Sequence, residues 1–321
     1  MKKNNYKFLV AGQEGMVGSA IYNILKKKKK YVIECKRKDL DFTDYKAVLK
    51  FFKKKKPNIV INAAGKVGGI LDNSKYPIDY LNINLAIGFN ILNISDKCNV
   101  KKVINIGSAC IYPKKTRLPI KEEYLLSSYL EKTNEAYALA KITTLKLCEY
   151  YKKFKNKDFI SVQPANLYGV NDNFNLKSSH VIPALIRKFY EAKKRNDKFV
   201  KIWGNGKNMR EFLYVDDLAN AIIKLIDKKN KFTYINIGSG EEVSIKELAK
   251  IIKTISKFKG HLFFDKNMPG GQKRRILSSK KIKSLAWKPL VSLKKGLELV
   301  YNFYEKKQIT AKNKSGFSRS R

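Results

Sequence analysis

A glycine-rich turn between a strand and a helix constrains the fold of this chain more than any other feature. Residues 7–11 form a short apolar run that predicts a buried strand, and a helical pattern follows over residues 16–27. Between them, Gly12, Gly15 and Gly18 allow a tight turn, backbone room for a pyrophosphate, and close packing of helix on strand. An ordinary tight turn would also use glycines, but strand, turn and helix in succession favour a dinucleotide site.

Strands and helices continue to alternate along the chain, with short connections between them. This order is typical of an α/β fold with a doubly wound parallel sheet of the Rossmann type, to which we expect a smaller C-terminal α/β substrate lobe to be attached. Residues 210–217 are predicted to begin a helix. We predict three parts: a dinucleotide-binding domain (1–169, with 210–240 returning to it), a substrate-binding lobe (170–209 and 241–305), and a disordered basic tail (306–321).

The residues after the second predicted strand bear on the choice between NAD and NADP. An acidic residue at the end of this strand accepts the ribose hydroxyls of NAD, whereas an arginine suits the 2′-phosphate of NADP. The strand, residues 31–35, is followed by Lys36 and Arg37, which favour NADP. Glu14 in the glycine loop would repel that phosphate if its side chain points inward, and its direction does not follow from the sequence.

Two further segments carry groups suited to proton transfer. Tyr137 and Lys141 are four residues apart in a predicted helix, so their side chains share one face. A neighbouring ammonium lowers the pKa of a phenol, which makes the tyrosine usable as a proton donor. The pair alone is weak evidence, because this spacing is common. Ser108 and Cys110 lie just past the predicted strand 102–106, where doubly wound sheets place their ligands.

The net charge of +41, from 68 Lys and Arg against 27 Asp and Glu, is extreme. Such a chain can bind nucleic acid or an anionic membrane. However, the lysines are scattered and often stand where helices should end, as at residues 26–30 and 53–56, and cations suit the dipole there. With no nucleic-acid-binding signature and no basic amphipathic helix, we expect a solvated, lysine-rich surface that attracts phosphorylated ligands, and neither a nucleic-acid nor a membrane partner.

The cysteines and the start of the chain indicate the compartment. Cys35, Cys98, Cys110 and Cys148 are widely spaced, and only two histidines accompany them, so we expect reduced thiols and no metal site. The first residues lead into a strand rather than a long apolar region, and no apolar run approaches the ~18 residues of a membrane span. These features favour a cytoplasmic protein.

Several segments together resemble one family, the GDP-L-fucose synthases of the extended short-chain dehydrogenase/reductase superfamily. The glycine and Tyr-xxx-Lys motifs are shared by the whole superfamily, whereas the segments around Cys110, Asn166 and His180 are more specific to this family. The resemblance spans roughly residues 7–250 and rests on AGQEGMVGSAI (11–21), NAAGKVGGI (62–70), IGSACIYPK (106–114), YALAKI (137–142), NLYGVNDNF (166–174), SHVIPALI (179–186), WGNGKNMREFLYVDDLA (203–219) and NIGSGEEVSI (236–245).

The resemblance implies a multifunctional enzyme, both isomerase and oxidoreductase, that makes GDP-L-fucose by nucleotide-sugar biosynthesis. Its substrate, GDP-4-keto-6-deoxy-D-mannose, has a C4 ketone that acidifies the C–H bonds at C3 and C5. By similarity, Cys110 is the base and His180 the acid of the 3,5-epimerisation, a thiol and an imidazole being residue types suited to proton transfer. NADPH then reduces C4 while Tyr137 protonates the oxygen, Ser108 hydrogen-bonds to it, and Lys141 holds the nicotinamide ribose.

The resemblance also implies the binding residues. Lys188, Trp203 and Arg210 are expected to bind the substrate, because cations suit a diphosphate and an aromatic ring suits a base or sugar. Trp203 is open to a second interpretation as an ordinary core residue. The residues expected to bind NADP(H) are Gly12, Gly15, Met16, Val17, Gly18, Arg37, Ala64, Lys141, Pro164, Asn166, Leu167 and His180.

Two other functions remain open from the residues alone. One is an enzyme of the same superfamily with another outcome, either a reductase without epimerisation or an NAD-dependent epimerase. The other is a non-catalytic basic protein that binds nucleic acid on the same fold, against which the set of Ser108, Tyr137 and Lys141 argues. By analogy with the family we expect a homodimer, formed through the helices of residues 83–96 and 137–154.

Overall fold

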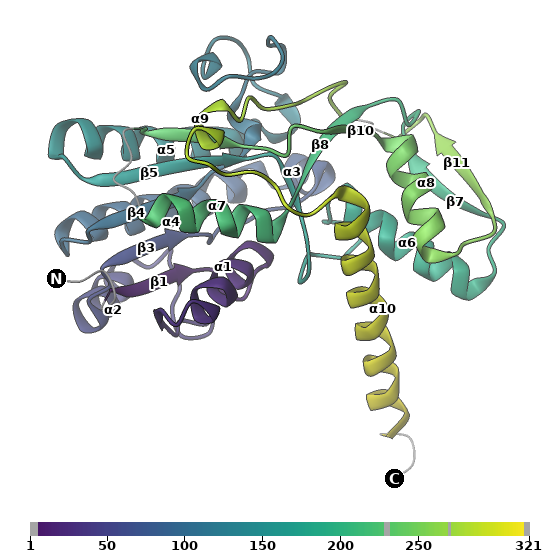
Figure 1. Ribbon diagram of the computed structural model, residues 1–321, viewed down its shortest axis with the longest axis horizontal. Helices are drawn as coiled ribbons and strands as arrows, with labels where there is room; N and C mark the ends of the chain where they lie inside the picture. The colour runs from purple at the N-terminus through teal and green to yellow at the C-terminus, as the bar shows by residue number, and fades with distance from the viewer. Residues whose placement is uncertain (1–5, 228–231, 269–270, 318–321) are drawn as a thin grey trace.

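The structure, a computed structural model, describes residues 6–227, 232–268 and 271–317 (Figure 1). Six parallel strands form the main sheet in the spatial order β2-β1-β3-β4-β5-β9, which confirms the predicted doubly wound fold. Chain order reverses between β1 and β3, the point where such sheets bind ligands. The strands are β1 (Lys7–Ala11), β2 (Tyr31–Ile33), β3 (Ile59–Asn62), β4 (Lys102–Ile106), β5 (Asp158–Pro164) and β9 (Tyr234–Ile237).

Alternate side chains of the sheet pack against helices on its two faces. In β1, Phe8 and Val10 join a core with helices α1 and α7, whereas Leu9 and Ala11 join another with α2 and α4. Helix α4 also packs along α5. Both faces of the sheet are therefore covered, as its near-continuous apolar strands require. These helices are α1 (Met16–Lys27), α2 (Tyr45–Lys55), α4 (Pro77–Lys97), α5 (Glu135–Lys155) and α7 (Val215–Asp227).

A second group of elements gathers at one end of the molecule (Figure 1). They share a separate apolar core that includes Phe189, Ile202 and Leu248. The division into the two predicted domains stays a prediction. The elements are β6 (Asn166–Tyr168), α6 (Val181–Arg195), β7 (Phe199–Trp203), β8 (Met209–Tyr214), β10 (Glu242–Ser244), α8 (Ile245–Ser256), β11 (His261–Asp265) and α10 (Leu293–Phe317).

Short helical segments complete the described chain and shape the connections at the sheet edge. They are α3 (Ile70–Lys75), α9 (Lys280–Lys283) and the single 3₁₀ turns η2 (Ala109–Ile111), η3 (Glu122–Tyr124) and η4 (Lys132–Asn134). Of these, η2 follows β4 and η4 directly precedes α5, so both lie next to residues that we expect to be catalytic.

Two local predictions are corrected. Residues 210–214 do not begin a helix but belong to β8, because their backbone pairs with β6 and β10, and helix α7 starts only at Val215. The tail from residue 306 was expected to be disordered, but α10 continues to Phe317. Lysine, glutamine and alanine favour a helix, and no proline interrupts residues 305–317. Residues 318–321 lie outside the described residues.

Candidate active site

The glycine loop after β1 has the backbone geometry that a bound diphosphate needs. Gly12 adopts a φ of +78°, and a side chain added there would meet the backbone of Ala63 and Ala64 at 2.9 Å. A side chain at Gly18 would lie 2.0 Å from the Gly12 carbonyl oxygen, so α1 can pack on the loop only because residue 18 has none. Gly15 caps α1 without a side-chain hydrogen bond, which leaves the first helical N–H groups for an anion.

The other residues expected to hold the cofactor follow the carboxyl ends of neighbouring strands. A side chain added at Gly169, just after β6, would come 3.7 Å from Met16 Cγ, so the end of β6 lies beside the start of α1. The predicted residues at these strand ends and at the start of α1 are Met16, Val17, Ala64, Pro164, Asn166 and Leu167.

The structure shows the direction of the Glu14 side chain, which did not follow from the sequence. Its carboxylate accepts a hydrogen bond of 2.7 Å from the backbone N–H of Arg37, so Glu14 points toward the residues after β2. The Lys36 and Arg37 side chains are exposed there. Two cationic side chains and one carboxylate therefore share the position where the adenosine ribose is bound in doubly wound folds.

Ser108 follows the carboxyl end of β4 and forms one hydrogen bond through its backbone and another through its side chain. Its N–H donates to the Gln163 side-chain oxygen at 2.9 Å, and its hydroxyl oxygen accepts the Cys110 N–H at 3.2 Å. The second bond caps η2, which turns the Cys110 side chain to the same edge of the sheet. Gln163 was not predicted as a site residue, although a polar residue within the apolar strand β5 was a usable signal.

Tyr137 and Lys141 share the inner face of α5, as the spacing predicts. The Lys141 ammonium lies 5.6 Å from the centre of the Tyr137 ring and donates to the Ile106 carbonyl oxygen at 3.2 Å. Burial lowers the pKa of Lys141 to about 8. Burial, followed by the nearby Cys110 thiol, raises the pKa of Tyr137, and a hydrogen bond with the Ser108 side chain opposes that rise.

The direction of the Tyr137 shift differs from our expectation that Lys141 would lower it. The pKa of Tyr137 responds to burial and to Cys110 and Ser108 rather than to Lys141. The physical reason is that desolvation of the phenolate outweighs the hydrogen bond from Ser108. Ser108, Cys110 and Tyr137 nevertheless lie close enough to interact, so the structure brings three of the predicted catalytic side chains together.

Asn134 is a further neighbour of the Cys110 thiol. It precedes α5, and its side-chain N–H donates to Cys110 Sγ at 3.2 Å. This bond orients the sulfur. Its place at the start of the Tyr137 helix was the only sequence signal for Asn134, and our prediction did not include it.

His180 caps α6 at the end of the loop 170–179 and remains exposed. That loop is tied to the segment after β3, because the Gly69 N–H donates to the Ser178 carbonyl at 2.9 Å. Although its ring reaches solvent, surrounding protein atoms lower the pKa of His180 by desolvation. The imidazole is therefore mainly neutral at pH 7, and its protonated form is a stronger acid than usual.

Arg275, which is distant in the sequence, forms hydrogen bonds that brace the turn around Cys110 (residues 109–113, here called the Cys110 turn). Its buried guanidinium donates to three carbonyl oxygens, those of Ala109, Tyr112 and Pro113, the last two at 3.2 and 3.3 Å. Its Nε donates to the Gln272 side chain at 2.7 Å. No local sequence signal indicates this contact, because Arg275 lies in a loop more than 150 residues beyond the turn.

The predicted substrate residues fall into two groups. The Lys188 ammonium lies 5.3 Å from the centre of the Trp203 ring and donates to the Lys201 carbonyl at 2.9 Å. Burial, and then the charge of Lys201, lowers the pKa of Lys188. Arg210 stands apart from this pair, in β8. Burial lowers the pKa of Arg210 to about 10, and the nearby charge of Arg275 adds to that effect, which places Arg210 beside the brace of the Cys110 turn.

The described residues contain neither a metal-binding cluster nor a membrane-spanning helix. Within them, no group of three or more His, Cys, Asp or Glu side chains is arranged to hold a metal ion. None of the helices in the same ranges combines the length and the apolar character that crossing a bilayer demands.

Comparison with known proteins identifies relatives along nearly the whole chain. Residues 8–238 match the model of the NAD dependent epimerase/dehydratase family. GDP-L-fucose synthase 1 of Arabidopsis thaliana is 45% identical over 307 residues, with 95% of each chain covered. GDP-L-fucose synthase of Escherichia coli K12 is 40% identical over 312 residues, covering 94% of this chain and 97% of the relative.

The fold has the same relatives. A solved GDP-mannoheptose C4 reductase from Campylobacter jejuni with NADP bound superposes with a TM-score of 0.86. It is 35% identical to this chain, and the match covers 95% of this chain and all of the reductase.

Proposed function

This chain belongs to the NAD-dependent epimerase/dehydratase family and, within it, to the GDP-L-fucose synthases, and on that premise we propose that it converts GDP-4-keto-6-deoxy-D-mannose to GDP-L-fucose. The protein is an NADP-dependent epimerase and reductase. The observation that carries the proposal is the gathering of Ser108, Cys110, Tyr137 and Lys141 at the carboxyl end of β4, where doubly wound sheets bind their ligands.

NADP(H) is the cofactor, and the residues of this chain fit it. The loop keeps its tight turn and its close packing under α1 only because Gly12 and Gly18 have no side chain, and the uncapped start of α1 suits a diphosphate. Lys36 and Arg37 offer positive charge to a 2′-phosphate, and their two charges outnumber the single Glu14 carboxylate beside them. When bound, NADPH supplies the hydride for C4, while the protein contributes position and protons.

For the reduction, Tyr137 gives its phenolic proton to the C4 oxygen and Ser108 hydrogen-bonds to the same oxygen. Burial raises the pKa of the phenol, so the proton is held until negative charge develops on that oxygen. Lys141 holds the nicotinamide ribose, and its fixed place beside the Tyr137 ring orients both groups.

For the epimerisation, Cys110 removes the acidic proton from C3 or C5 and His180 returns a proton on the opposite face. The hydrogen bond from Asn134 fixes the position of the sulfur, which supports Cys110 as the base. Lys188, Trp203 and Arg210 bind the GDP end of the substrate.

The test is to incubate the purified protein with NADPH and GDP-4-keto-6-deoxy-D-mannose in D₂O and to identify the product sugar. The proposal predicts GDP-L-fucose with deuterium at C3 and C5 and one NADPH consumed per product. Cys110→Ser should stop deuterium incorporation while NADPH consumption continues. A reduced product that has kept its original configuration and carries no deuterium would contradict the epimerase half of the proposal.

A reductase without epimerisation is the second candidate, and the similarity to a GDP-mannoheptose C4 reductase favours it. The same D₂O experiment separates the two, because a pure reductase consumes NADPH without exchange at C3 or C5. An NAD-dependent epimerase would instead exchange these positions with no net consumption of cofactor.

We propose further that two chains associate through α4 and α5. Ile78 and Phe89 on α4, and Leu139 and Tyr150 on α5, are exposed apolar side chains, and each pair is eleven residues apart, about three helical turns. Each pair therefore lies along one face. Light scattering tests this dimer, and charge-introducing substitutions at Phe89 and Leu139 should give monomers. The free thiols of the described residues support a cytoplasmic location.

A further inference from the structure

Lysines that look scattered along the sequence converge at one end of the structure. In a doubly wound fold the helices run antiparallel to the strands, so they all end at the edge of the sheet opposite the ligand edge. Lysine runs 26–30 and 53–56 follow the ends of α1 and α2, and Lys97, Lys101, Lys153 and Lys155 lie at the ends of α4 and α5. We call these residues the basic end.

Helix dipoles do not account for so many cations. The carboxyl end of a helix carries about half a negative charge, which a single lysine already offsets. Within the described residues, Lys26 pairs with Glu34 at 3.4 Å and Lys155 with Asp96 at 2.5 Å, whereas the other lysines of the two runs form no ion pair. Adjacent exposed ammonium groups repel one another, so the basic end is an electrostatic cost to the isolated chain that an anionic partner would relieve.

The two edges of the main sheet differ in charge. At the opposite edge of the sheet, where the cofactor binds, Lys36 and Arg37 stand among Glu14, Asp39 and Asp41. Attraction of a phosphorylated substrate and cofactor therefore does not explain the basic end, which faces away from them.

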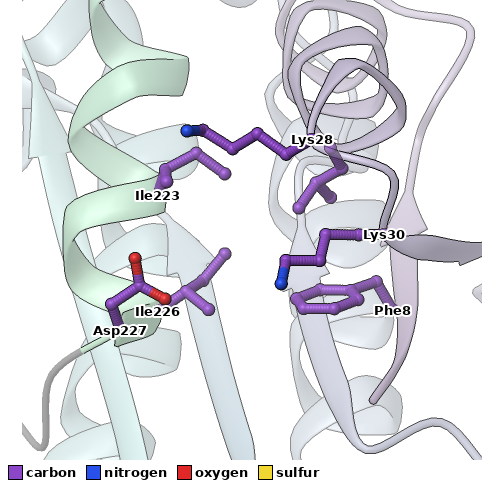
Figure 2. A pocket seen from close by; sticks show the side chains of 7 residues that line it. Phe8, Lys28, Lys30, Ile223, Ile226 and Asp227 are labelled. Carbon is purple, nitrogen blue, oxygen red and sulfur yellow. The ribbon is translucent and has the colours of Figure 1, made fainter. Parts of the chain in front are cut away.

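The basic end is hollowed where α1 and α7 finish. A cavity of about 320 Å³ lies there, with Phe8 and Ile226 among its apolar walls. Figure 2 shows Lys28 and Lys30 extending across it from the end of α1 toward α7, with the Asp227 carboxylate on the far side. The recess therefore offers two ammonium groups to a segment of a phosphate backbone.

The size and chemistry of the basic end fit a polyanion with regularly spaced charges. Six strands spaced about 4.8 Å apart make the edge about 25 Å wide, enough for several successive phosphates. The cations are lysines, point charges that bind phosphate without reading bases. Exposed Tyr31 and Phe154 offer rings for base stacking, and apart from Phe154 no exposed Leu, Ile, Val or Phe of the described residues stands among these lysines to enter a bilayer.

We propose, in place of our expectation from the sequence that the chain has no nucleic-acid partner, that the basic end binds single-stranded nucleic acid through its phosphate backbone, without sequence preference. This surface is separate from the catalytic edge, so catalysis and nucleic-acid binding do not exclude each other. The inference does not depend on which sugar the enzyme converts.

The test is fluorescence anisotropy with a labelled single-stranded RNA of mixed sequence, at salt from 50 to 200 mM. The variant Lys53→Gln, Lys54→Gln, Lys55→Gln removes three charges from the basic end. Its matched control, Lys246→Gln, Lys257→Gln, Lys259→Gln, removes three exposed charges from the other end of the molecule. At about 0.1 M salt we expect the first variant to bind about tenfold or more weakly, with a salt slope smaller by about 2, and the control to change less than about threefold.

Both variants should keep the NADPH-consuming activity of the parent protein, because neither touches the catalytic edge. Equal weakening by the two variants would overturn the proposal, since it would show a response to net charge alone. No retention of RNA at about 0.15 M salt would overturn it as well. So would binding to phosphatidylserine vesicles that exceeds binding to RNA, because it would assign the basic end to membranes.

Discussion

Replacing Arg275 by alanine should damage the fold and the epimerisation together. The substitution removes charged donors from the carbonyl oxygens of Ala109, Tyr112 and Pro113 in a buried site. A hydrogen bond from a charged group contributes about 1.5–3 kcal/mol, and the three are not additive because water can fill the space left. We therefore expect the free energy of unfolding to fall by about 3–5 kcal/mol.

A loss of epimerisation is expected as well, because the carbonyls that accept hydrogen bonds from Arg275 lie in the turn that positions Cys110. A displacement of about 1 Å in a reacting group costs on the order of a hundredfold in rate, so deuterium exchange at C3 and C5 should fall by about that factor. Reduction should suffer less, because Gln163 holds Ser108 independently. Arg275→Lys should restore part of both losses, since it keeps the charge but not the forked geometry.

Urea unfolding and the exchange assay check this prediction, with Arg274→Ala as the matched control. Arg274 is the neighbouring arginine, and its exposed guanidinium pairs with Glu242 at 2.6 Å rather than with the turn. Its replacement should leave exchange intact. If Arg275→Ala exchanged at the wild-type rate and unfolded within about 1 kcal/mol of the wild type, the bracing role would be refuted.

Three other predictions follow from the cofactor edge. Gly18→Ala puts a methyl group 2.0 Å from the Gly12 carbonyl oxygen, so the affinity for NADPH should fall about a hundredfold. Fluorescence titration measures this affinity, and an unchanged dissociation constant would contradict the packing argument. Arg37→Ala should weaken NADPH more than NADH, and an equal effect on both would remove Arg37 from 2′-phosphate recognition. Because burial lowers the pKa of Lys141 to about 8, the folded protein binds fewer protons at this group than the unfolded chain does between about pH 8 and 10.5. The free energy of unfolding should therefore rise with pH by about 3 kcal/mol across that window, relative to the Lys141→Met variant. If the unfolding free energies of the two proteins changed with pH in parallel, the pKa shift would be refuted.

The fold was predictable because its signals are local. The strand, glycine turn and helix of residues 7–27 follow one another directly, and the alternation of elements that continues beyond them specifies a doubly wound sheet. The helix predicted from Arg210 was wrong at its start, since pairing with β6 and β10 draws residues 209–214 into a strand. Long-range pairing of this kind overrides local pattern.

The candidate site was predictable in part for the same reason. Tyr137, Lys141, Ser108 and Cys110 stand in motifs with recognisable spacing, and the structure gathers them at one edge. Arg275 reaches that edge from a distant loop, and no pattern around it indicates this contact.

The pKa shifts and the clustering of charge were the features least predictable from the sequence. The pKa of Tyr137 depends on burial, which the spacing of two residues does not report, and it is raised where we expected it to be lowered. The convergence of lysine runs 26–30 and 53–56 likewise required the helix directions as well as the positions of the residues.

The most direct test of the central claim is stopped-flow NADPH oxidation by Tyr137→Phe with GDP-4-keto-6-deoxy-D-mannose. If the phenol protonates the C4 oxygen, oxidation should slow by about 10²–10⁴-fold, while NADPH binding and the exchange at C3 and C5 persist. Oxidation at the wild-type rate would show that Tyr137 does not donate this proton and would contradict the account.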